Sequence, residues 1–545
     1  MTNTLLTLHD PAAARRYYAQ RLWRDDTFYT LVAKHAAERP DAPALRDATR
    51  RLNWAELKRA VDAVAADLDA AGLKRGERVA VWLPNRVEAV AVFLACSRQG
   101  YVCNPSLHQN YTVAEIVALL ERTNAAALFA QPGYGADASR ADIFAAAGAL
   151  PFLRKIYSLD GDAASPFPTH ADTVPPPASD PDSVVYLAFT SGTTGTPKGV
   201  MHSANTLFAN ARAMVADWHH DASTVLLSLS PLSHHIATVA IAQATHAGME
   251  LVVNSPPRGM TPFDWIVETG ATYVMGVPTH AMDILAEMRR RGLDRLGKVK
   301  TFYMAGSVIP REVAQAFLDR GVIPQNVYGM SENSSHQYTL PSDSPETIVG
   351  TCGKACAAYE IKLWDQENPD IEVPPGEVGE IAGRGACLML GYFDNQRATE
   401  DSFNRPGWFL SGDLGRFDEN GNLEIVGRKK DLIIRGGHNI HPARIEELAM
   451  RHKSVAKCAA FAVADTRLGE KVCLSVIWHE GESGEADAML THLHAEGLSK
   501  YDMPEYFIAM DAYPLTASGK ILKRELVEWA KSGHIAPTPV RWTGG

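Results

Sequence analysis

A segment rich in glycine and hydroxyl side chains, residues 190–199, carries the clearest chemical signal in this sequence. It reads Thr-Ser-Gly-Thr-Thr-Gly-Thr-Pro-Lys-Gly, with three glycines, four threonines, one serine and Lys198. Glycines let backbone amides turn toward an anion, hydroxyl groups donate further hydrogen bonds, and lysine adds a positive charge. The segment follows a strand-like run, 184–189, and precedes a predicted helix over 202–218. We therefore expect a loop that binds a polyphosphate rather than an ordinary flexible loop.

Two common nucleotide-binding patterns are excluded for this loop. A P-loop needs Gly-Lys followed by Ser or Thr, whereas Lys198 lies between Pro197 and Gly199. The dinucleotide pattern G-x-G-x-x-G does not occur in the segment either. A nucleotide is expected, but neither P-loop hydrolysis nor dinucleotide redox chemistry follows.

Further polar motifs occur later in the chain. Tyr328-Gly-Met-Ser-Glu332 combines a flat ring, which suits a base, with a carboxylate, which suits Mg²⁺. Ser411-Gly-Asp413 offers a carboxylate whose two oxygens can accept hydrogen bonds from a diol. Each motif alone would also fit a simple turn, so their combination and order carry the interpretation. The remaining motifs are Gly427-Arg-Lys-Lys-Asp431, Arg435-Gly-Gly-His-Asn-Ile-His-Pro442 and Pro514-Leu-Thr-Ala-Ser-Gly-Lys520-Ile-Leu-Lys-Arg-Glu525.

In this order, the segments resemble the signature motifs of the adenylate-forming superfamily. This superfamily includes acyl-CoA synthetases, the adenylation domains of peptide synthetases and firefly luciferase. The resemblance extends over nearly the whole chain and points to the acid–CoA ligase branch. It implies that a carboxylate and ATP give acyl-AMP and pyrophosphate, and that coenzyme A then gives acyl-CoA and AMP. ATP, coenzyme A and Mg²⁺ are the expected substrates and cofactor.

The resemblance also implies roles for single residues. Lys520 would bridge the substrate carboxylate and the α-phosphate, Glu332 would hold Mg²⁺, and Lys198 would hold the leaving pyrophosphate. Lys430 matches the hinge, and Gly436 and Gly437 match the glycines that line the pantetheine tunnel. The residues matched to ATP or AMP binding are Thr190, Ser191, Gly192, Thr193, Thr194, Gly195, Gly306, Ser307, Asn326, Tyr328, Gly329, Ser331, Asp413 and Arg428.

The acyl pocket is matched through Pro231-Leu-Ser-His-His235, where His234 resembles the residue that gates the pocket and completes the catalytic set. The expected lining is His234, His235, Met275, Gly276, Val277, Val308 and Met330. No acidic residue lies within 228–239, where amino-acid-activating relatives carry an aspartate. His235 stands where aryl-acid ligases of siderophore pathways commonly have asparagine, which argues against that group of ligases. We expect an acid that is uncharged apart from its carboxylate; medium-chain, alicyclic (such as cyclohexanecarboxylate) and aryl acids all remain open.

The elements that position these motifs read as α/β. Helix-like spacing over 28–39 and 54–71 alternates with short apolar runs such as 78–83, which is typical of parallel sheets with covered faces. Past residue 350 the runs shorten, and a charged stretch precedes a final segment with its own strands. Together with the resemblance, this predicts a large N-terminal domain, 1–429, of stacked α/β subdomains plus a β-barrel-like subdomain. A small mobile α+β domain, 430–545, would follow.

Composition limits the function classes. The chain has 545 residues with 53 Lys+Arg and 63 Asp+Glu, a net charge of −10, which argues against nucleic acid as the main partner. Its seven cysteines are scattered, which is typical of reduced thiols rather than of a disulfide framework. The apolar run 89–96 is far shorter than the roughly 20 residues of a membrane span, and the N-terminus does not resemble a signal peptide. We expect a cytoplasmic protein without a transmembrane segment, with small-molecule partners, and a homodimer as in many relatives.

Two other functions compete with the ligase. One is a stand-alone adenylating enzyme that loads an acid onto a carrier protein, which shares the first half-reaction. The other is a nucleotide-binding regulator without catalysis. Loss of Lys520 or Glu332 would favour the regulator, but both residues are present.

Overall fold

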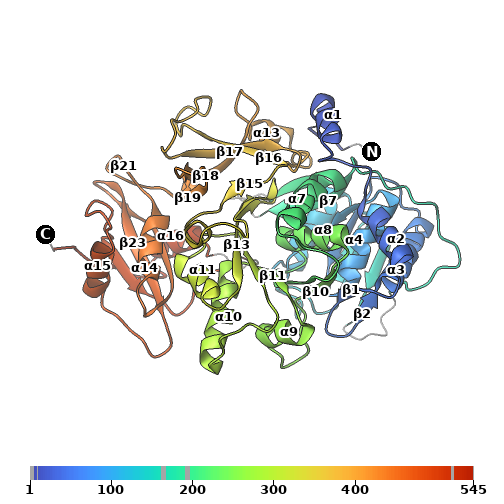
Figure 1. Cartoon of the computed structure of the whole chain (residues 1–545), viewed down its shortest axis with the longest axis horizontal. Helices are drawn as coiled ribbons and strands as arrows, with labels where there is room; N and C mark the ends of the chain where they lie inside the picture. Colours follow the sequence, from blue (N-terminus) through green and yellow to red (C-terminus); the bar gives the residue numbers. More distant parts are fainter. Residues whose placement is uncertain (1–4, 9, 161–166, 191–196, 517–520, 544–545) are drawn as a thin grey trace.

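The computed structural model describes residues 5–8, 10–160, 167–190, 197–516 and 521–543. Within these ranges the strands form four sheets, and the chain runs from two large sheets through a small antiparallel sheet to a separate C-terminal sheet. Figure 1 shows the C-terminal elements gathered at the end of the molecule away from α2 and α3.

The N-terminal sheet has six strands in the order β6-β5-β3-β4-β7-β8. All neighbours are parallel except β7 and β8, which form an antiparallel hairpin. The strands are β3 (Arg78–Trp82), β4 (Val102–Asn104), β5 (Ala127–Ala130), β6 (Lys155–Ser158), β7 (Val184–Thr190) and β8 (Lys198–Ser203).

The central sheet has nine strands in the order β15-β14-β13-β12-β11-β9-β10-β1-β2. The strands from β1 to β13 in this order are parallel, and both outer parts are antiparallel. The strands are β1 (Pro43–Arg46), β2 (Arg51–Asn53), β9 (Val225–Ser228), β10 (Glu250–Val253), β11 (Tyr273–Gly276), β12 (Thr301–Met304), β13 (Ile323–Met330), β14 (Ser334–Tyr338) and β15 (Lys354–Ala355).

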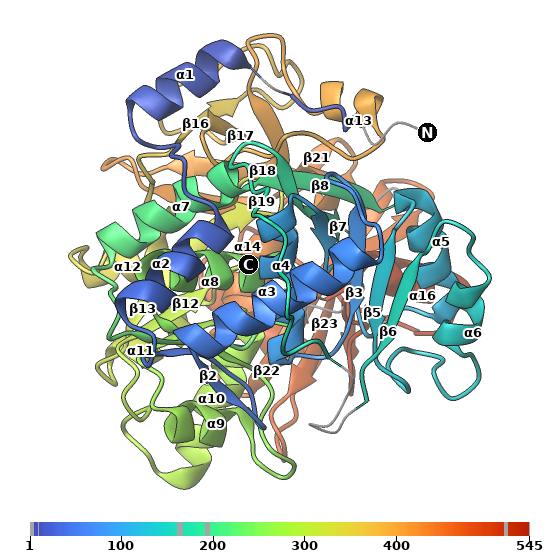
Figure 2. The ribbon, with the colours of Figure 1, turned by 90° about the vertical axis from the view of Figure 1, so that its right-hand side faces the viewer.

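Helices cover both faces of the two large sheets. One core cluster joins α2, α3, α4, α7 and α8 to strands of both sheets, so these helices form a shared layer. Figure 2 shows α5 and α6 beside β3, β5 and β6, on the side away from α2. Helices α9, α10 and α11 pack on the other face of the central sheet. These helices are α2 (Phe28–Glu38), α3 (Trp54–Ala70), α4 (Val87–Gln99), α5 (Val113–Thr123), α6 (Ile143–Gly148), α7 (Ala204–Asp217), α8 (His235–Ala247), α9 (Pro262–Thr269), α10 (Pro278–Arg291) and α11 (Arg311–Leu318).

Successive side chains of the central strands pack alternately into the two helix layers that cover the sheet. In β11, Tyr273 and Met275 belong to the shared core, whereas Val274 belongs to the core under α9, α10 and α11. Both faces are apolar because successive side chains point to opposite faces and both faces are covered. The helices cover the faces of the sheet and not the ends of its strands. Open α/β sheets bind ligands at the carboxyl ends of their strands.

A small antiparallel sheet, β16-β17-β18-β19, follows the central sheet. Its strands are β16 (Tyr359–Trp364), β17 (Gly379–Gly385), β18 (Phe409–Phe417) and β19 (Leu423–Arg428). The subdomain expected to be barrel-like is therefore a four-stranded sheet with β16 and β19 at its edges. The shorter helices outside the main layers are α1 (Pro11–Ala19), α12 (Pro345–Gly350) and α13 (Gln396–Glu400).

A 3₁₀ turn, Lys429–Asp431, leads from β19 into the C-terminal sheet, β21-β20-β23-β24-β25, with β22 paired to β23. This part has its own core, formed with α14 and α15. The elements are β20 (Ile433–Arg435), β21 (His438–Ile440), α14 (Pro442–Met450), β22 (Val455–Asp465), β23 (Gly469–Trp478), α15 (Ala486–Ala495), β24 (Tyr506–Ala509), α16 (Lys523–Ser532) and β25 (Thr538–Pro539). The boundary between 429 and 430 stays a prediction, compatible with this separate core.

Two ion pairs join α11 to the C-terminal part. Arg311 Nε lies 3.8 Å from Glu447 Oε1 on α14, and Arg451 Nε lies 3.7 Å from Glu312 Oε1. All four side chains are partly exposed, between 24% and 47%.

The α/β class with a large N-terminal and a small C-terminal part is confirmed. One local expectation is wrong. The helix predicted over 202–218 begins only at Ala204, because strand β8 comes first. The glycine-rich segment therefore connects two antiparallel strands. Helix α7 begins with a capping box. The Ser203 side chain accepts the backbone N–H of Thr206, and the Thr206 side chain accepts that of Ser203.

Candidate functional site

The ends of the glycine-rich loop are fixed by the β7–β8 hairpin. Thr190 closes β7 and pairs with Lys198, the first residue of β8. The Lys198 ammonium lies 4.6 Å from the centroid of the Tyr392 ring, a cation–π distance. Between these ends, Ser191, Gly192, Thr193, Thr194 and Gly195 lie outside the described residues, so their phosphate-binding roles stay predictions.

Tyr392 links this loop to the second motif, although no sequence motif marked it. Its hydroxyl donates a hydrogen bond of 2.8 Å to Glu332 Oε1. Lys198, Tyr392 and Glu332 thus form one continuous group, with a cation and a carboxylate on either side of the aromatic ring.

Glu332 lies in the tight turn between β13 and β14. Met389 donates its backbone N–H to the Glu332 carbonyl at 2.7 Å, and the Met330 N–H bonds to Asn333 Oδ1 at 3.0 Å. Ser334 adopts a left-handed backbone with φ 57°, an unusual conformation for a residue with a side chain. The turn is therefore held in a specific, partly strained shape, as is common where function requires precise placement.

Burial raises the pKa of Glu332, because a desolvated carboxylate is less stable than a carboxylic acid. The Tyr392 hydrogen bond and the Lys198 charge oppose this effect by stabilising the anion, while the charge of Asp413 adds to it. A metal ion or bound cation would favour the ionised form further.

The residues present fit Mg²⁺ at Glu332. Within the described ranges, no three His, Cys, Asp or Glu side chains group together so as to hold a metal ion. Mg²⁺ is commonly bound by one or two carboxylates together with substrate phosphates rather than by an all-protein cage. A single half-buried carboxylate, linked through Tyr392 to Lys198, matches that mode of binding.

Replacing Tyr392 with phenylalanine tests this electrostatic balance. The variant keeps the ring over Lys198 but removes the hydrogen bond that lowers the pKa of Glu332. The pKa of Glu332 should therefore rise further, and the acid limb of the pH–rate profile for the expected adenylate formation should move to higher pH. An acid limb at the same pH in both proteins would contradict the assignment of Glu332 as the titrating group.

A second connected group involves the motifs around Tyr328 and Asp413. The Tyr328 hydroxyl donates to Asp413 Oδ2 at 3.1 Å, and Arg428 Nε lies 3.0 Å from Asp413 Oδ1. Arg428 faces Asp413 because β18 and β19 pair these two residues directly. The Asp413 charge raises the pKa of the Arg428 guanidinium, and the Tyr328 side chain is buried. The motifs therefore bring a ring, a carboxylate and a guanidinium together, while binding of a diol by Asp413 stays a prediction.

Glu380, which no sequence motif marked, supports the ends of β18 and β19 through hydrogen bonds. Glu380 is buried, and its carboxylate accepts from Lys429 Nζ at 2.9 Å and from the Gly412 N–H at 3.1 Å. Lys429 directly precedes Lys430, the expected hinge residue, which is exposed. No spacing pattern in the sequence marks Glu380, since it pairs with residues distant along the chain.

The remaining nucleotide candidates lie at the carboxyl ends of central strands. Gly306 follows β12 with a φ of +97°, and Ser307 beside it is exposed. Asn326 lies on β13 two residues before Tyr328, where its amide nitrogen donates to the Ile348 carbonyl and its Oδ1 has no partner among the described residues. Their contacts with a nucleotide stay predictions.

The expected acyl pocket residues come from the start of α8, the ends of β11 and β13, and the segment after β12. His234 caps the N-terminus of α8, where its Nδ1 accepts from the Ile236 N–H at 3.4 Å. His235 is buried, and its Nε2 lies 3.0 Å from Ser334 Oγ. Three more, Met275, Gly276 and Val277, are buried at the end of β11, whereas Val308 is 43% exposed and Met330 is half-buried at the end of β13.

The motifs of the C-terminal part are only partly described. Gly436 and Gly437 form the exposed turn between β20 and β21 with φ of +60° and +87°, a conformation that favours glycine. Lys520 lies outside the described residues. Its bridging role and the tunnel role of Gly437 stay predictions.

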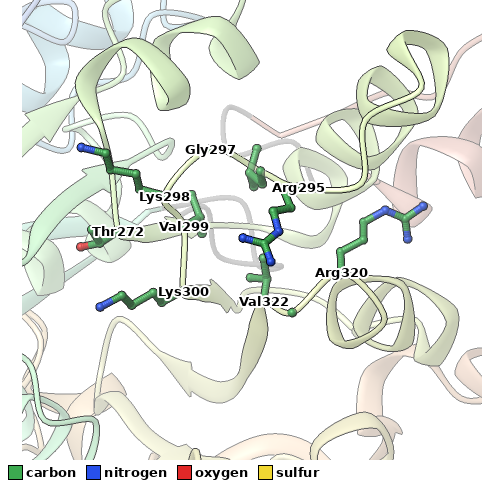
Figure 3. A pocket seen from close by; sticks show the side chains of 10 residues that line it. Thr272, Arg295, Gly297, Lys298, Val299, Lys300, Arg320 and Val322 are labelled. Atoms are coloured by element: carbon green, nitrogen blue, oxygen red, sulfur yellow. The ribbon is translucent and has the colours of Figure 1, made fainter.

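A cavity of about 560 Å³ lies away from these motifs, at the amino ends of the central strands. Thr272, Lys300 and Val322 line it, and each directly precedes a parallel strand. Figure 3 shows Arg295, Lys298, Lys300 and Arg320 around this cavity with their charged ends pointing in different directions. Because the groups do not converge, the cavity is not part of the candidate site.

Comparison with known proteins decides the family. Residues 32–393 match the family "AMP-binding enzyme", and residues 444–520 match "AMP-binding enzyme C-terminal domain". The chain belongs to the AMP-binding enzyme family. The expected membership of the adenylate-forming superfamily is thereby confirmed, and the matched ranges contain the glycine-rich loop, the Tyr328–Glu332 motif and the segment ending at Lys520.

Relatives in this AMP-binding family are similar over almost their full length. A medium-chain fatty-acid–CoA ligase of Escherichia coli (strain K12) is 29% identical over 93% of this chain and 91% of its own length. A feruloyl-CoA synthase of Amycolatopsis sp is 32% identical over 90% of this chain and 97% of its own. The ATP-bound MatB of Rhodopseudomonas palustris, a solved structure, is 26% identical over 94% of this chain and 100% of its own, with a TM-score of 0.81. In the part of this chain that the structure describes, no helix is long and apolar enough to cross a membrane.

Proposed function

We propose that this protein is an AMP-forming acid–CoA ligase that makes an acyl-adenylate and then an acyl-CoA. One observation carries the proposal: side chains from four separate motifs lie in one connected region. Lys198, Tyr392 and Glu332 form one group, and Tyr328, Asp413 and Arg428 form the other. The two groups meet in the Tyr328–Glu332 segment at the end of β13, which supplies one residue to each.

In the first half-reaction, a carboxylate oxygen of the acid attacks the α-phosphorus of ATP. A new P–O bond forms, the bond to the bridging oxygen breaks, and pyrophosphate leaves with that electron pair. Lys198 would neutralise the leaving pyrophosphate, and Asp413 would accept the ribose hydroxyls and orient the nucleotide. Glu332 would hold Mg²⁺, which neutralises phosphate charge when bound.

In the second half-reaction, the thiol of coenzyme A gives its proton to solvent and its sulfur attacks the acyl carbonyl carbon. A C–S bond forms, the bond from the acyl carbon to the phosphate oxygen breaks, and AMP leaves with that electron pair. We infer that the C-terminal part turns about Lys430 between the two half-reactions. It would withdraw Lys520 after the first step and present the Gly437 turn for the second. The isolated core of the C-terminal part and the exposed turn are compatible with such a movement.

The acid is proposed to be uncharged apart from its carboxylate. The expected pocket residues at the end of β11, Met275, Gly276 and Val277, are small or apolar and buried. The two relatives above are named for a medium-chain fatty acid and for a feruloyl group, which carries an aromatic ring. Medium-chain, alicyclic and aryl carboxylates are therefore the classes to test first.

A product assay tests the proposed function directly. The protein is incubated with ATP, Mg²⁺ and a library of these carboxylates, with and without coenzyme A, and products are identified by mass spectrometry. Acyl-CoA formed only with coenzyme A is the expected result. Acyl-AMP that persists with coenzyme A present would favour a carrier-protein-loading enzyme, and no adenylate with any acid would reject the ligase.

Replacing Gly437 with tryptophan should separate the two half-reactions. A Cβ added at Gly437 meets nothing within 4 Å and the residue is exposed, so the fold should tolerate a side chain there apart from the strain of a positive φ. We expect ATP–pyrophosphate exchange to stay within about threefold of the parent, while acyl-CoA formation falls by about 100-fold or more because the thiol path is blocked.

Gly437→Ala is the matched control, because it introduces the same backbone strain without the bulk. Acyl-CoA formation that falls equally in both variants would assign the effect to strain. Unchanged acyl-CoA formation in the tryptophan variant would reject the tunnel assignment.

A further inference from the structure

Two buried histidines lie behind the Glu332 turn, and one of them belongs to no motif. His202 lies near the end of β8 and is fully buried, and His235 is the first residue of α8. Their rings stack with centroids 5.4 Å apart and an interplanar angle of 25°. They join the strand that follows the phosphate loop to the helix beside the expected acyl pocket.

His202 contacts the Glu332 turn through a short hydrogen bond. Its Nε2 lies 2.6 Å from the carbonyl oxygen of Ser331. A carbonyl oxygen can only accept, so Nε2 carries the proton. Burial lowers the pKa of His202 to about 4, so the ring is neutral at pH 7 and Nδ1 is an acceptor. Nδ1 takes its hydrogen bond from the Thr206 hydroxyl, 3.0 Å away.

This contact lies at a sensitive point, because the Ser331 carbonyl belongs to the peptide bond that leads into Glu332. On the other side of Glu332, its own carbonyl accepts the Met389 N–H at 2.7 Å. The Glu332 carboxylate accepts from Tyr392 at 2.8 Å. The backbone on both sides of Glu332 and the carboxylate itself are thus each held by a separate hydrogen bond, one from β8 and two from the segment between β17 and α13.

His235 braces the far end of the same turn. Its Nε2 lies 3.0 Å from Ser334 Oγ, and Ser334 is the residue with the left-handed backbone. The stacked pair therefore holds the turn at both ends, at Ser331 through His202 and at Ser334 through His235. Since the rings also contact each other, neither contact can shift without disturbing the other.

We propose that His202 is a positioning residue for adenylate formation: by holding the Ser331 carbonyl, it fixes the direction in which Glu332 and the Ser331 hydroxyl face the phosphates of ATP. The inference rests on the proposed function. His202 is fully buried and its Nε2 bonds to the Ser331 carbonyl, so its effect must pass through the turn. The thiol step, which needs neither pyrophosphate nor Mg²⁺ at Glu332, should depend on it much less.

The test compares two variants in separate half-reactions. His202→Leu removes the donor and keeps an apolar side chain, whereas His202→Gln keeps an N–H that can reach the Ser331 carbonyl. We expect His202→Leu to lower ATP–pyrophosphate exchange by about 10- to 100-fold and to raise the Mg²⁺ concentration needed for half-maximal rate. The reaction of pre-made acyl-AMP with coenzyme A should stay within about threefold, and His202→Gln should recover most of the exchange rate.

His35 offers a matched control elsewhere in the large domain. It is also a buried histidine whose Nε2 lies 2.9 Å from a backbone carbonyl, that of Thr245, but it contacts no part of the Glu332 turn. His35→Leu should lower thermal stability as much as His202→Leu does, without separating the two half-reactions. Equal loss of both half-reactions in His202→Leu, or the same separation in His35→Leu, would overturn the inference.

A measurement on the parent protein covers the case in which His202→Leu does not fold. With ¹⁵N-labelled histidine, NMR should show His202 as the Nε2–H tautomer, assigned by its absence in His202→Gln. Its Nε2–H signal should shift on addition of ATP with Mg²⁺, while that of His35 should not. An unchanged His202 signal at saturating nucleotide would overturn the positioning role. A parent protein that forms no adenylate with any acid would instead reject the proposed function.

Discussion

Replacing Glu332 with glutamine is expected to lower the rate of acyl-adenylate formation by about 100- to 1,000-fold, the usual cost of removing one preorganised charge-stabilising group. The amide keeps the shape of the side chain and an oxygen that can accept from Tyr392, so the turn should keep its structure. What is lost is the negative charge that would hold Mg²⁺ beside Lys198. ATP–pyrophosphate exchange over a range of Mg²⁺ concentrations measures this loss.

The same variant should not be less stable than the parent at neutral pH. Burial raises the pKa of Glu332 in the folded protein above its usual value, so the folded state takes up a proton more readily than the unfolded state. As the pH rises from the unfolded-state pKa through the folded-state pKa, ionisation of Glu332 lowers the free energy of unfolding. Glutamine does not ionise, so the variant avoids this loss. Thermal unfolding at pH 7 should give an equal or higher Tm. A normal exchange rate at limiting Mg²⁺ would contradict the role of Glu332.

Replacing Gly329 with alanine is expected to damage the site through the backbone. An added Cβ would lie 1.8 Å from the Ser334 carbonyl oxygen, 2.9 Å from the Ser334 carbonyl carbon and 3.1 Å from the Ser335 Cα. These are backbone atoms of the paired strand β14, so relief requires opening the turn that carries Glu332. We expect the free energy of unfolding to fall by about 3 kcal/mol, together with loss of ATP binding.

Gly148 provides the matched glycine-to-alanine control. It lies at the end of α6, where an added Cβ meets nothing within 4 Å. Gly148→Ala should leave ATP binding unchanged and the free energy of unfolding within about 1 kcal/mol of the parent. Denaturant unfolding and calorimetric titration with ATP measure both quantities. If the two variants were equally stable, the close approach at Gly329 would be wrong.

Elements with strong local signals could be predicted from the sequence. Helix α3 is an example, because its apolar residues recur at helical spacing and its predicted end, 71, lies one residue past Ala70. Strand β8 was missed because it begins at Lys198, next to a proline and glycines that read as a loop. Its last two residues, His202 and Ser203, fall within the predicted helix, because two residues are compatible with either period.

The candidate site likewise contains residues that the sequence could predict and residues that it could not. Lys198, Glu332 and Asp413 could be proposed because each lies in a motif of fixed spacing. Tyr392 and His202 could not, because their contacts with the Glu332 turn depend on how distant elements pack. Such residues have no local pattern, so only the three-dimensional arrangement identifies them.

The ion pairs between α11 and α14 have a consequence for how the two parts of the chain hold together. Arg311–Glu447 and Arg451–Glu312 are separated by 3.8 Å and 3.7 Å at partly exposed positions. Pairs of this kind contribute about 0–1 kcal/mol each and weaken with salt. Each pair is therefore weak enough for thermal motion to break it, so the two pairs do not lock the C-terminal part in one position. For the proposed rotation, ionic strength should therefore help to set the pace at which the enzyme passes from its first product to its second.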